Sequence, residues 1–378
     1  MNIFMPSMPG MMKVFGVSYD TVQFTLTLYL VALAVAQLFI GPLSDRFGRR
    51  PIALWGLLVF LIGSFICITA PDILILSVGR AIQAAGGCAG IVMARTMIRD
   101  LYGSAKAAKM IAVLVLAMII IPVIAPSLGG FLDEIYGWQA GFYVVFGFAL
   151  LVLFASYYFL QETHFNLHDS ISVIRTIHGF GQLLGHLSFN KFALQISFAS
   201  AAFFAFIGGS PYVVMELMGH SPKEYGFYFM VVGLSYMIGN FVTTRTTETW
   251  GINVLINLGI YLAAAGGLFL LICYFMGILN APILFAAMSA IALANGLSLP
   301  TSIAGAIGVD PERIGAAAGL SGFLQIAAGA AASFIVGNML SHSAAPLVYI
   351  MSGSAFLALA SYKVAEVLEA KKIGEQLN

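Results

Sequence analysis

Charged side chains are scarce in this chain of 378 residues: they make up 9% of it, against about 25% in an ordinary soluble domain. The hydrophobic share is correspondingly high, at 60%. The 17 Lys and Arg nearly balance the 16 Asp and Glu, so the chain lacks the basic field that would attract nucleic acid. These features exclude a water-soluble globule and predict that lipid is the main partner.

Cysteine clusters and nucleotide motifs are also missing. Cys67, Cys88 and Cys273 lie in separate apolar runs without CxxC spacing, so no disulfide framework or metal site is expected. No G-x-x-x-x-G-K-[ST] occurs, which argues against ATP as the energy source, and no cofactor motif is found. None of the six His lies within an apolar run, and the acids lie between or at the ends of the runs, so an intramembrane enzyme is not expected.

Long apolar runs dominate what is present. Eleven continuous stretches reach about 18 residues, the length needed to cross a bilayer core. Their continuity favours helices over a barrel. The sequence therefore predicts an all-α polytopic membrane protein with spans at 22–43, 52–70, 73–99, 107–131, 139–160, 192–215, 225–244, 253–277, 282–307, 314–340 and 346–366.

Residues 1–12 are apolar but too short to span, and they lack the charged start and cleavage site of a signal peptide. We interpret them as the outer end of a curtailed first helix. On this interpretation, the natural product is expected to begin about 15 to 20 residues upstream.

The Lys and Arg residues predict the orientation, because cytoplasmic loops retain them. With the loop at 45–50 inside, fourteen basic residues lie on or near the inner side, and only Lys13 and Lys223 lie outside. The chain is then a multi-pass protein of the cell inner membrane with a cytoplasmic tail at 367–378. A monomer is expected.

A polar segment at 162–190 divides the chain into an N-terminal bundle at 1–161 and a C-terminal bundle at 191–366. The first holds the partial helix and five complete ones, and the second holds six. The segment is interpreted as a cytoplasmic linker. Its histidines, His164, His168, His178 and His186, have spacings that match no tight metal-ligand pattern.

The loop between the first two complete spans reads GPLSDRFGRRP from Gly41 to Pro51. Gly41 is expected to let two helices approach, and Gly48 to permit a tight reversal. Asp45 is expected near a helix start, where the helix dipole favours a carboxylate. Arg46, Arg49 and Arg50 can then pair with Asp45 or with lipid headgroups.

This loop resembles the G-x-x-x-D-R-x-G-R-R loop of the major facilitator superfamily. The resemblance implies two six-helix bundles around a central cavity that opens alternately to each side, here with the first helix truncated. It also implies a cytoplasmic gating loop made of Gly41, Asp45, Arg46, Gly48, Arg49 and Arg50.

Arg80 lies about seven residues inside a span, where a charge is costly and usually functional. With Gln83, Gly86 and Gly87 it is similar to the superfamily's R-x-x-Q-G-x-G element, although Ala84 replaces a Gly. Arg80 and Gln83 are therefore candidates for the substrate cavity or for coupling. The other interpretation is that Arg80 extends to the interface or bonds to a neighbouring backbone.

The stretch from Pro122 to Gly130 resembles the antiporter element G-P-x-x-G-G. Pro126, Gly129 and Gly130 match, whereas Ala125 replaces the first Gly. Pro122 and Pro126 are expected to bend the helix, and the glycines to admit a close neighbour. The resemblance favours export, although a plain kinked helix would look similar.

Further stretches, including Arg99-Asp100, Gly137-Trp138 and Gln161-Glu162-Thr163, are similar to the bicyclomycin and chloramphenicol resistance branch of drug:proton antiporters. That branch commonly has Asp where this chain has Asn2. A neutral Asn cannot carry the coupling proton. The proton group then lies upstream of the chain or on the cytoplasmic side, as at Asp45, or the protein is uncoupled.

Two functions follow. The first is export of small, largely apolar compounds in exchange for protons. The second is facilitated movement or import of a small anionic metabolite, with Arg80 as its counter-charge. The charge of the transported compound would separate them.

Overall fold

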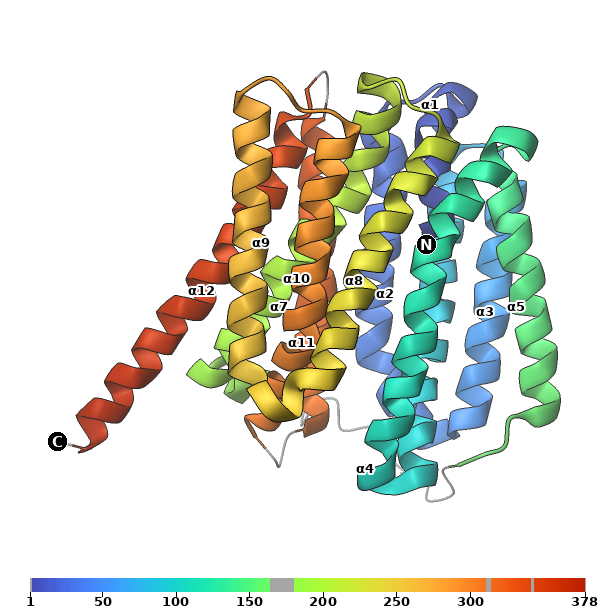
Figure 1. Ribbon diagram of the computed structural model, residues 1–378. Helices are drawn as coiled ribbons and strands as arrows, with labels where there is room; N and C mark the ends of the chain where they lie inside the picture. Colours follow the sequence, from blue (N-terminus) through green and yellow to red (C-terminus); the bar gives the residue numbers. More distant parts are fainter. Residues whose placement is uncertain (1, 164–179, 311–313, 341–342, 378) are drawn as a thin grey trace. The chain divides into compact units, whose positions relative to one another are not determined.

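The computed structural model describes residues 2–163, 180–310, 314–340 and 343–377. Within these ranges it leaves undescribed the side chains of residues 42, 95, 99, 102–117, 119, 122–123, 314–316 and 372–377. All regular structure in the described ranges is helical (Figure 1). The chain forms two compact units: residues 1–173 with 221–226, and residues 174–220 with 227–378. The prediction of an all-α membrane protein is confirmed.

The first unit contains six helical elements. A 3₁₀ helix, η1, opens the chain and is followed by a short α-helix; both are largely buried. The Asp72 carboxylate caps the start of the fourth α-helix by accepting from the Ile75 N–H at 2.9 Å. The elements are η1 (Asn2–Ser7), α1 (Met8–Phe15), α2 (Tyr19–Phe47), α3 (Arg49–Thr69), α4 (Ile73–Tyr136) and α5 (Gln139–Phe159).

α4 is helical without a break, and yet it folds back on itself at the lower end of the view (Figure 1). The Arg80 guanidinium lies 4.7 Å from the Phe4 ring centre, while Gly129 packs against the Ile3 carbonyl. In a straight helix Arg80 and Gly129 would be about 74 Å apart. The predicted break between 99 and 107 is therefore wrong, because these residues continue the helix through the turn.

The second unit begins beyond a helical stretch at 180–184. The Asn280 side chain caps the start of α10 by accepting from the Ile283 N–H at 3.0 Å. The elements are α7 (Leu187–Pro211), a π-helical segment η2 (Tyr212–Leu217), α8 (Pro222–Trp250), α9 (Ile252–Phe275), α10 (Ala281–Gly308), α11 (Ile314–Met339) and α12 (Ala345–Leu377).

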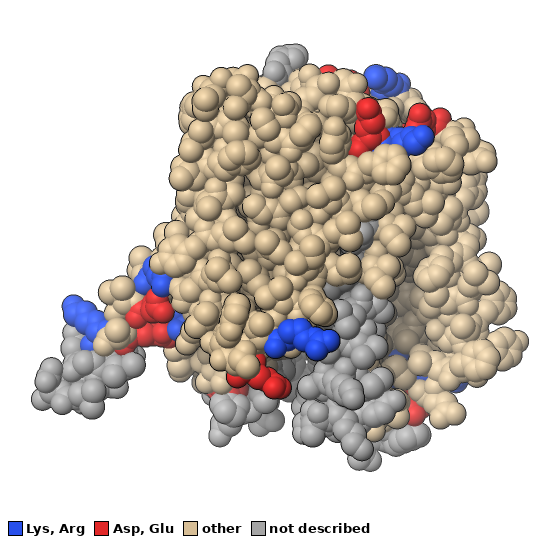
Figure 2. Space-filling view, in the orientation of Figure 1, with Lys and Arg blue, Asp and Glu red and all other residues tan. Residues whose placement is uncertain are grey.

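Ten helices in the described residues are long and apolar enough to cross a membrane. They correspond to ten of the eleven predicted spans. Many side chains of the remaining span, 107–131, lie outside the description. α12 continues to Leu377, so residues expected in a tail extend the last helix. Charged side chains gather near helix ends, with uncharged surface between them (Figure 2).

Small residues let helices pack closely. A Cβ added to Gly86 in α4 would lie 2.3 Å from the Phe60 backbone nitrogen in α3. In the second unit, a Cβ on Gly239 in α8 would lie 2.3 Å from the Leu293 carbonyl oxygen in α10. Without a hydrophobic driving force in lipid, such backbone approach supplies packing energy between spans.

Candidate functional site

Gly48 forms the reversal between α2 and α3. Its φ of +95° lies in the region that favours glycine, and its N–H donates to the Ser44 carbonyl at 3.1 Å. The end of α2 and the start of α3 therefore meet at one residue. This reversal places Asp45 and Arg49 on neighbouring turns.

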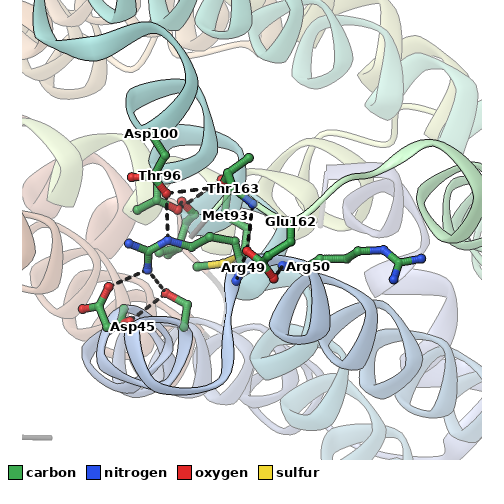
Figure 3. A network of polar contacts seen from close by, with 11 residues as sticks. Asp45, Arg49, Arg50, Met93, Thr96, Asp100, Glu162 and Thr163 are labelled. Carbon is green, nitrogen blue, oxygen red and sulfur yellow. Dashed lines mark hydrogen bonds and ion pairs between the residues drawn. The ribbon is translucent and has the colours of Figure 1, made fainter. Parts of the chain in front are cut away.

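Arg49 is the centre of a polar cluster at this reversal (Figure 3). The Arg49 side chain is 8% exposed, and its Nη1 donates to Asp45 Oδ1 at 2.6 Å and to Ser44 Oγ. Its Nε donates to Asp100 Oδ2 at 3.0 Å. One guanidinium thus joins the end of α2 to α4. Such charge-assisted bonds are about twice as strong as neutral ones.

Glu162, in the segment after α5, completes the cluster. Its Oε1 accepts from the Arg49 N–H at 3.0 Å, and its Oε2 accepts from the Arg50 N–H at 3.1 Å. These are the first N–H groups of α3, which have no partner inside the helix. A carboxylate there also interacts favourably with the helix dipole. Glu162 therefore caps α3 from 113 residues away.

Thr163 ties the same segment to α4, since its Oγ1 donates to Asp100 Oδ2 at 3.3 Å. We define the Arg49 cluster by the side chains that share these bonds: Ser44, Asp45, Arg49, Asp100, Glu162 and Thr163.

Two expectations about this loop are wrong. Asp45 lies in the last turn of α2 rather than near a helix start, and the carboxylate at the start of α3 belongs to Glu162. A Cβ on Gly41 would meet no heavy atom within 4 Å, so no close helix approach occurs there in the described part of the chain.

The neighbouring arginines take other contacts. Arg50 Nη2 donates to the Tyr157 carbonyl at 2.8 Å, and its guanidinium lies 5.8 Å from the Tyr157 ring centre. Arg46 is exposed, and its guanidinium lies 5.2 Å from the Phe47 ring centre. Of the three arginines, the described structure therefore pairs Arg49 with Asp45.

Arg80 lies inside the first unit and is 2% exposed. Its Nη1 donates to Gln83 Oε1 at 2.6 Å, and Gln83 Nε2 donates to Ser64 Oγ at 2.8 Å. Its guanidinium lies 4.2 Å from the Tyr29 ring centre and 4.7 Å from that of Phe4. Aromatic faces therefore provide much of the stabilisation of this cation.

Two donor atoms of Arg80 stay unused. Nε and Nη2 have no hydrogen-bond partner among the described residues. A cavity of about 20 Å³ adjoins Arg80 and is also lined by Gln83, Phe4 and Trp138. This is the Arg80 cavity. Its size suits a single water molecule.

The structure separates the remaining candidates from Arg80. Asn2 is half-buried and is not among the residues that line the Arg80 cavity. A Cβ on Gly129 would lie 2.1 Å from the Ile3 carbonyl oxygen, and one on Gly130 would lie 2.3 Å from that of Pro222. Pro126 is buried, and the side chain of Pro122 lies outside the description. Both glycines therefore occupy close backbone contacts within the first unit.

Asp133 is a carboxylate of interest near the end of α4, beyond the predicted span 107–131. Burial raises the pKa of Asp133, and a hydrogen bond from the Ser7 side chain opposes this rise. The charged form of this group is thus disfavoured by its surroundings.

Sequence reasoning missed the roles of Glu162, Asp100 and Ser44. Glu162 was placed in the linker, and Asp100 was expected at a helix end rather than inside α4. Both belong to stretches that resemble the drug:proton antiporter branch, which was the available signal. The contact of Arg80 with Phe4 and Tyr29 had no local signal.

Comparisons with known proteins agree with this architecture. The model of the Major Facilitator Superfamily matches residues 1–333. The xylose transporter XylE from E. coli, in a partially occluded inward-open conformation, has a TM-score of 0.74 and 15% identity. The alignment covers 96% of this chain and 93% of XylE, and it concerns the fold alone.

Three relatives match most of the chain. The MFS-type transporter YdgK of Bacillus subtilis is 29% identical, over 89% of this chain and 84% of its own. A bicyclomycin resistance protein homolog of Haemophilus influenzae is 24% identical, over 96% and 91%. Multidrug resistance protein D of Escherichia coli is 27% identical, over 86% and 81%. The chain is therefore a transporter rather than an enzyme, and it belongs to the major facilitator superfamily.

Proposed function

We propose that this transporter exports small, largely apolar compounds across the cell inner membrane, in exchange for protons and by alternating access. The supporting observation is that two relatives covering 86% and 96% of the chain are named for resistance to drugs or to bicyclomycin. The 30 Phe and 15 Tyr supply ample aromatic surface for such compounds. In this proposal residues 1–161 and 191–366 form the two bundles, and residues 162–190 form the cytoplasmic linker.

The Arg49 cluster is the proposed cytoplasmic latch. Its contacts join α2, α3, α4 and the segment after α5 through one buried guanidinium. Asp45 is the more exposed partner, at 48%, so its bond to Arg49 can be broken and remade at low cost. Pairing in one state and separation in the other would make the cluster a two-state element.

Proton exchange requires a group that binds and releases a proton. Asn2 cannot do this. Asp45 is one candidate, and Asp133 is a second because burial favours its protonated form.

The decisive experiment is uptake into inverted vesicles at imposed pH gradients, with cationic, neutral and anionic compounds. We expect uptake of apolar neutral or cationic compounds that rises with the proton gradient. Asp45→Asn should leave the protein folded and slow uptake, whereas Asp20→Asn at the other end of α2 should not. Gradient-independent uptake would contradict antiport, and normal uptake by the Asp45 variant would remove the latch.

A second candidate is transport of a small anionic metabolite. The two unused nitrogens of Arg80 favour it, because a buried cation gains most from an anionic partner. The size of the Arg80 cavity disfavours it, since ligand sites usually measure about 300–1,000 Å³. Anion uptake that Arg80→Lys retains and Arg80→Gln loses would establish this function in place of export.

A further inference from the structure

A large apolar groove lies within the first unit, separate from the Arg80 cavity. It encloses about 620 Å³, a volume in the range of ligand sites. α3, both arms of α4, α5 and the start of η1 line it. Among the described lining residues, Asn2 alone has a polar side chain. We call this space the apolar groove.

Glycines on the first arm of α4 leave the apolar groove open. A Cβ added to Gly90 would meet no heavy atom within 4 Å, and Gly86 and Gly87 line the same side. Water gains little in such surroundings, because it needs two to four polar partners. The groove is therefore suited to hydrocarbon.

The rim of the groove continues into surface that faces lipid. Ile121 and Ile124 on the second arm of α4 are 61% and 52% exposed, and Phe148 on α5 is 63% exposed. All three also line the groove. Just beyond the rim, Leu151 on α5 is 69% exposed. In a membrane, hydrocarbon can enter the groove without crossing a polar barrier.

The length of the groove matches one lipid chain. Its lining extends from Val144 to Val152 on α5 and from Ile120 to Leu128 on α4. Each stretch rises about 12 Å along its helix axis. One leaflet of a hydrocarbon core about 30 Å thick has a depth of about 15 Å.

We propose that the apolar groove binds one acyl chain of a membrane phospholipid, which completes the core of the first unit. The chain fills space left by the α4 glycines and contacts Phe60 and Ala149 from inside. This inference depends on the membrane location of the protein and not on which compound it transports.

Labelling with a photoactivatable lipid tests the proposal. The protein is reconstituted into phosphatidylethanolamine and phosphatidylglycerol vesicles with a trace of phospholipid carrying a diazirine in its acyl chain. Peptide mass spectrometry then compares adducts on Ala149 and Leu151. Ala149 lines the groove and is 5% exposed, whereas Leu151 is exposed outside it. Both should be labelled in the wild-type protein.

Filling the groove should remove one label only. Because Gly90→Phe replaces lipid contact with protein, the Ala149 to Leu151 ratio should fall at least about fivefold. Ala125→Phe, which fills the groove from the other arm of α4, should act likewise. Gly147→Phe is the matched control: it is an exposed α5 glycine with open space around it that does not line the groove.

Melting temperature monitors folding of each variant. An unlabelled Ala149 in the wild type would overturn the proposal without any variant, because lipid is then not the occupant. An unchanged ratio in folded Gly90→Phe would overturn it too. Displacement of the Ala149 label by an added apolar drug, but not by unlabelled phospholipid, would assign the groove to drug instead.

Discussion

At the scale of single residues, Glu162 has the clearest energetic role. Its carboxylate accepts from two N–H groups that α3 cannot satisfy itself. Glu162→Ala should therefore lower the free energy of unfolding by about 1–2 kcal/mol. Thermal unfolding in detergent measures this loss. Glu134→Ala, an exposed Glu near the end of α4, is the control and should change little.

Glu162→Gln should be less damaging than Glu162→Ala, since an amide oxygen still accepts one hydrogen bond but carries no charge. Equal stability of all three proteins would show that water caps α3 equally well.

Asp133 predicts a pH dependence. Its pKa is raised by burial above the ordinary value of 3.8, so the folded state holds the proton more tightly than the unfolded state. The stability from this proton is full below about pH 4 and is lost as pH rises through the folded pKa. Asp133→Asn is neutral throughout, so its melting temperature should exceed that of wild type at pH 8, with a gap that shrinks toward pH 4. A gap that widens on acidification would contradict this sign.

At the scale of helices, the α3–α4 contact depends on the absence of a side chain. Gly86→Ala would place a Cβ 2.3 Å from the Phe60 nitrogen and 2.6 Å from the Gly56 carbonyl oxygen, and neither backbone atom can move alone. We expect a loss of about 1–3 kcal/mol or more from overpacking.

Gly90→Ala, one turn further along α4, is the matched control. It has open space, and it should stabilise the helix by roughly 0.5–1 kcal/mol. Denaturant unfolding of the two variants compares the signs. Equal effects would mean that helix propensity, and not interhelical contact, decides both.

Helix ends were predictable where the signal is local. The apolar runs gave the spans to within a few residues at α5, α9 and α10, because hydrocarbon thickness sets their length. The fold-back of α4 was not predictable, since residues 100–106 are polar enough for a loop and still compatible with helix. The capping of α3 by Glu162 had no signal either, because tertiary contact across 113 residues determines it.

At the scale of the whole molecule, the uneven distribution of Lys and Arg predicts a cytoplasmic C-terminus. Green fluorescent protein fused after Asn378 should fluoresce, and alkaline phosphatase fused there should be inactive. Alkaline phosphatase inserted after Gly277, in the predicted outer connection between α9 and α10, should be active. The reverse pattern would invert the topology and place the Arg49 cluster outside the cell.

The cap on α3 also orders events during synthesis. The ribosome adds about 5–20 residues per second, so roughly 6 to 23 s separate Arg49 from Glu162. During that interval the first N–H groups of α3 have only water as a partner. All members of the Arg49 cluster precede α7, however, so this closure needs no residue of the second unit. The nascent chain can therefore secure the inner end of its first helices while the ribosome is still translating the rest.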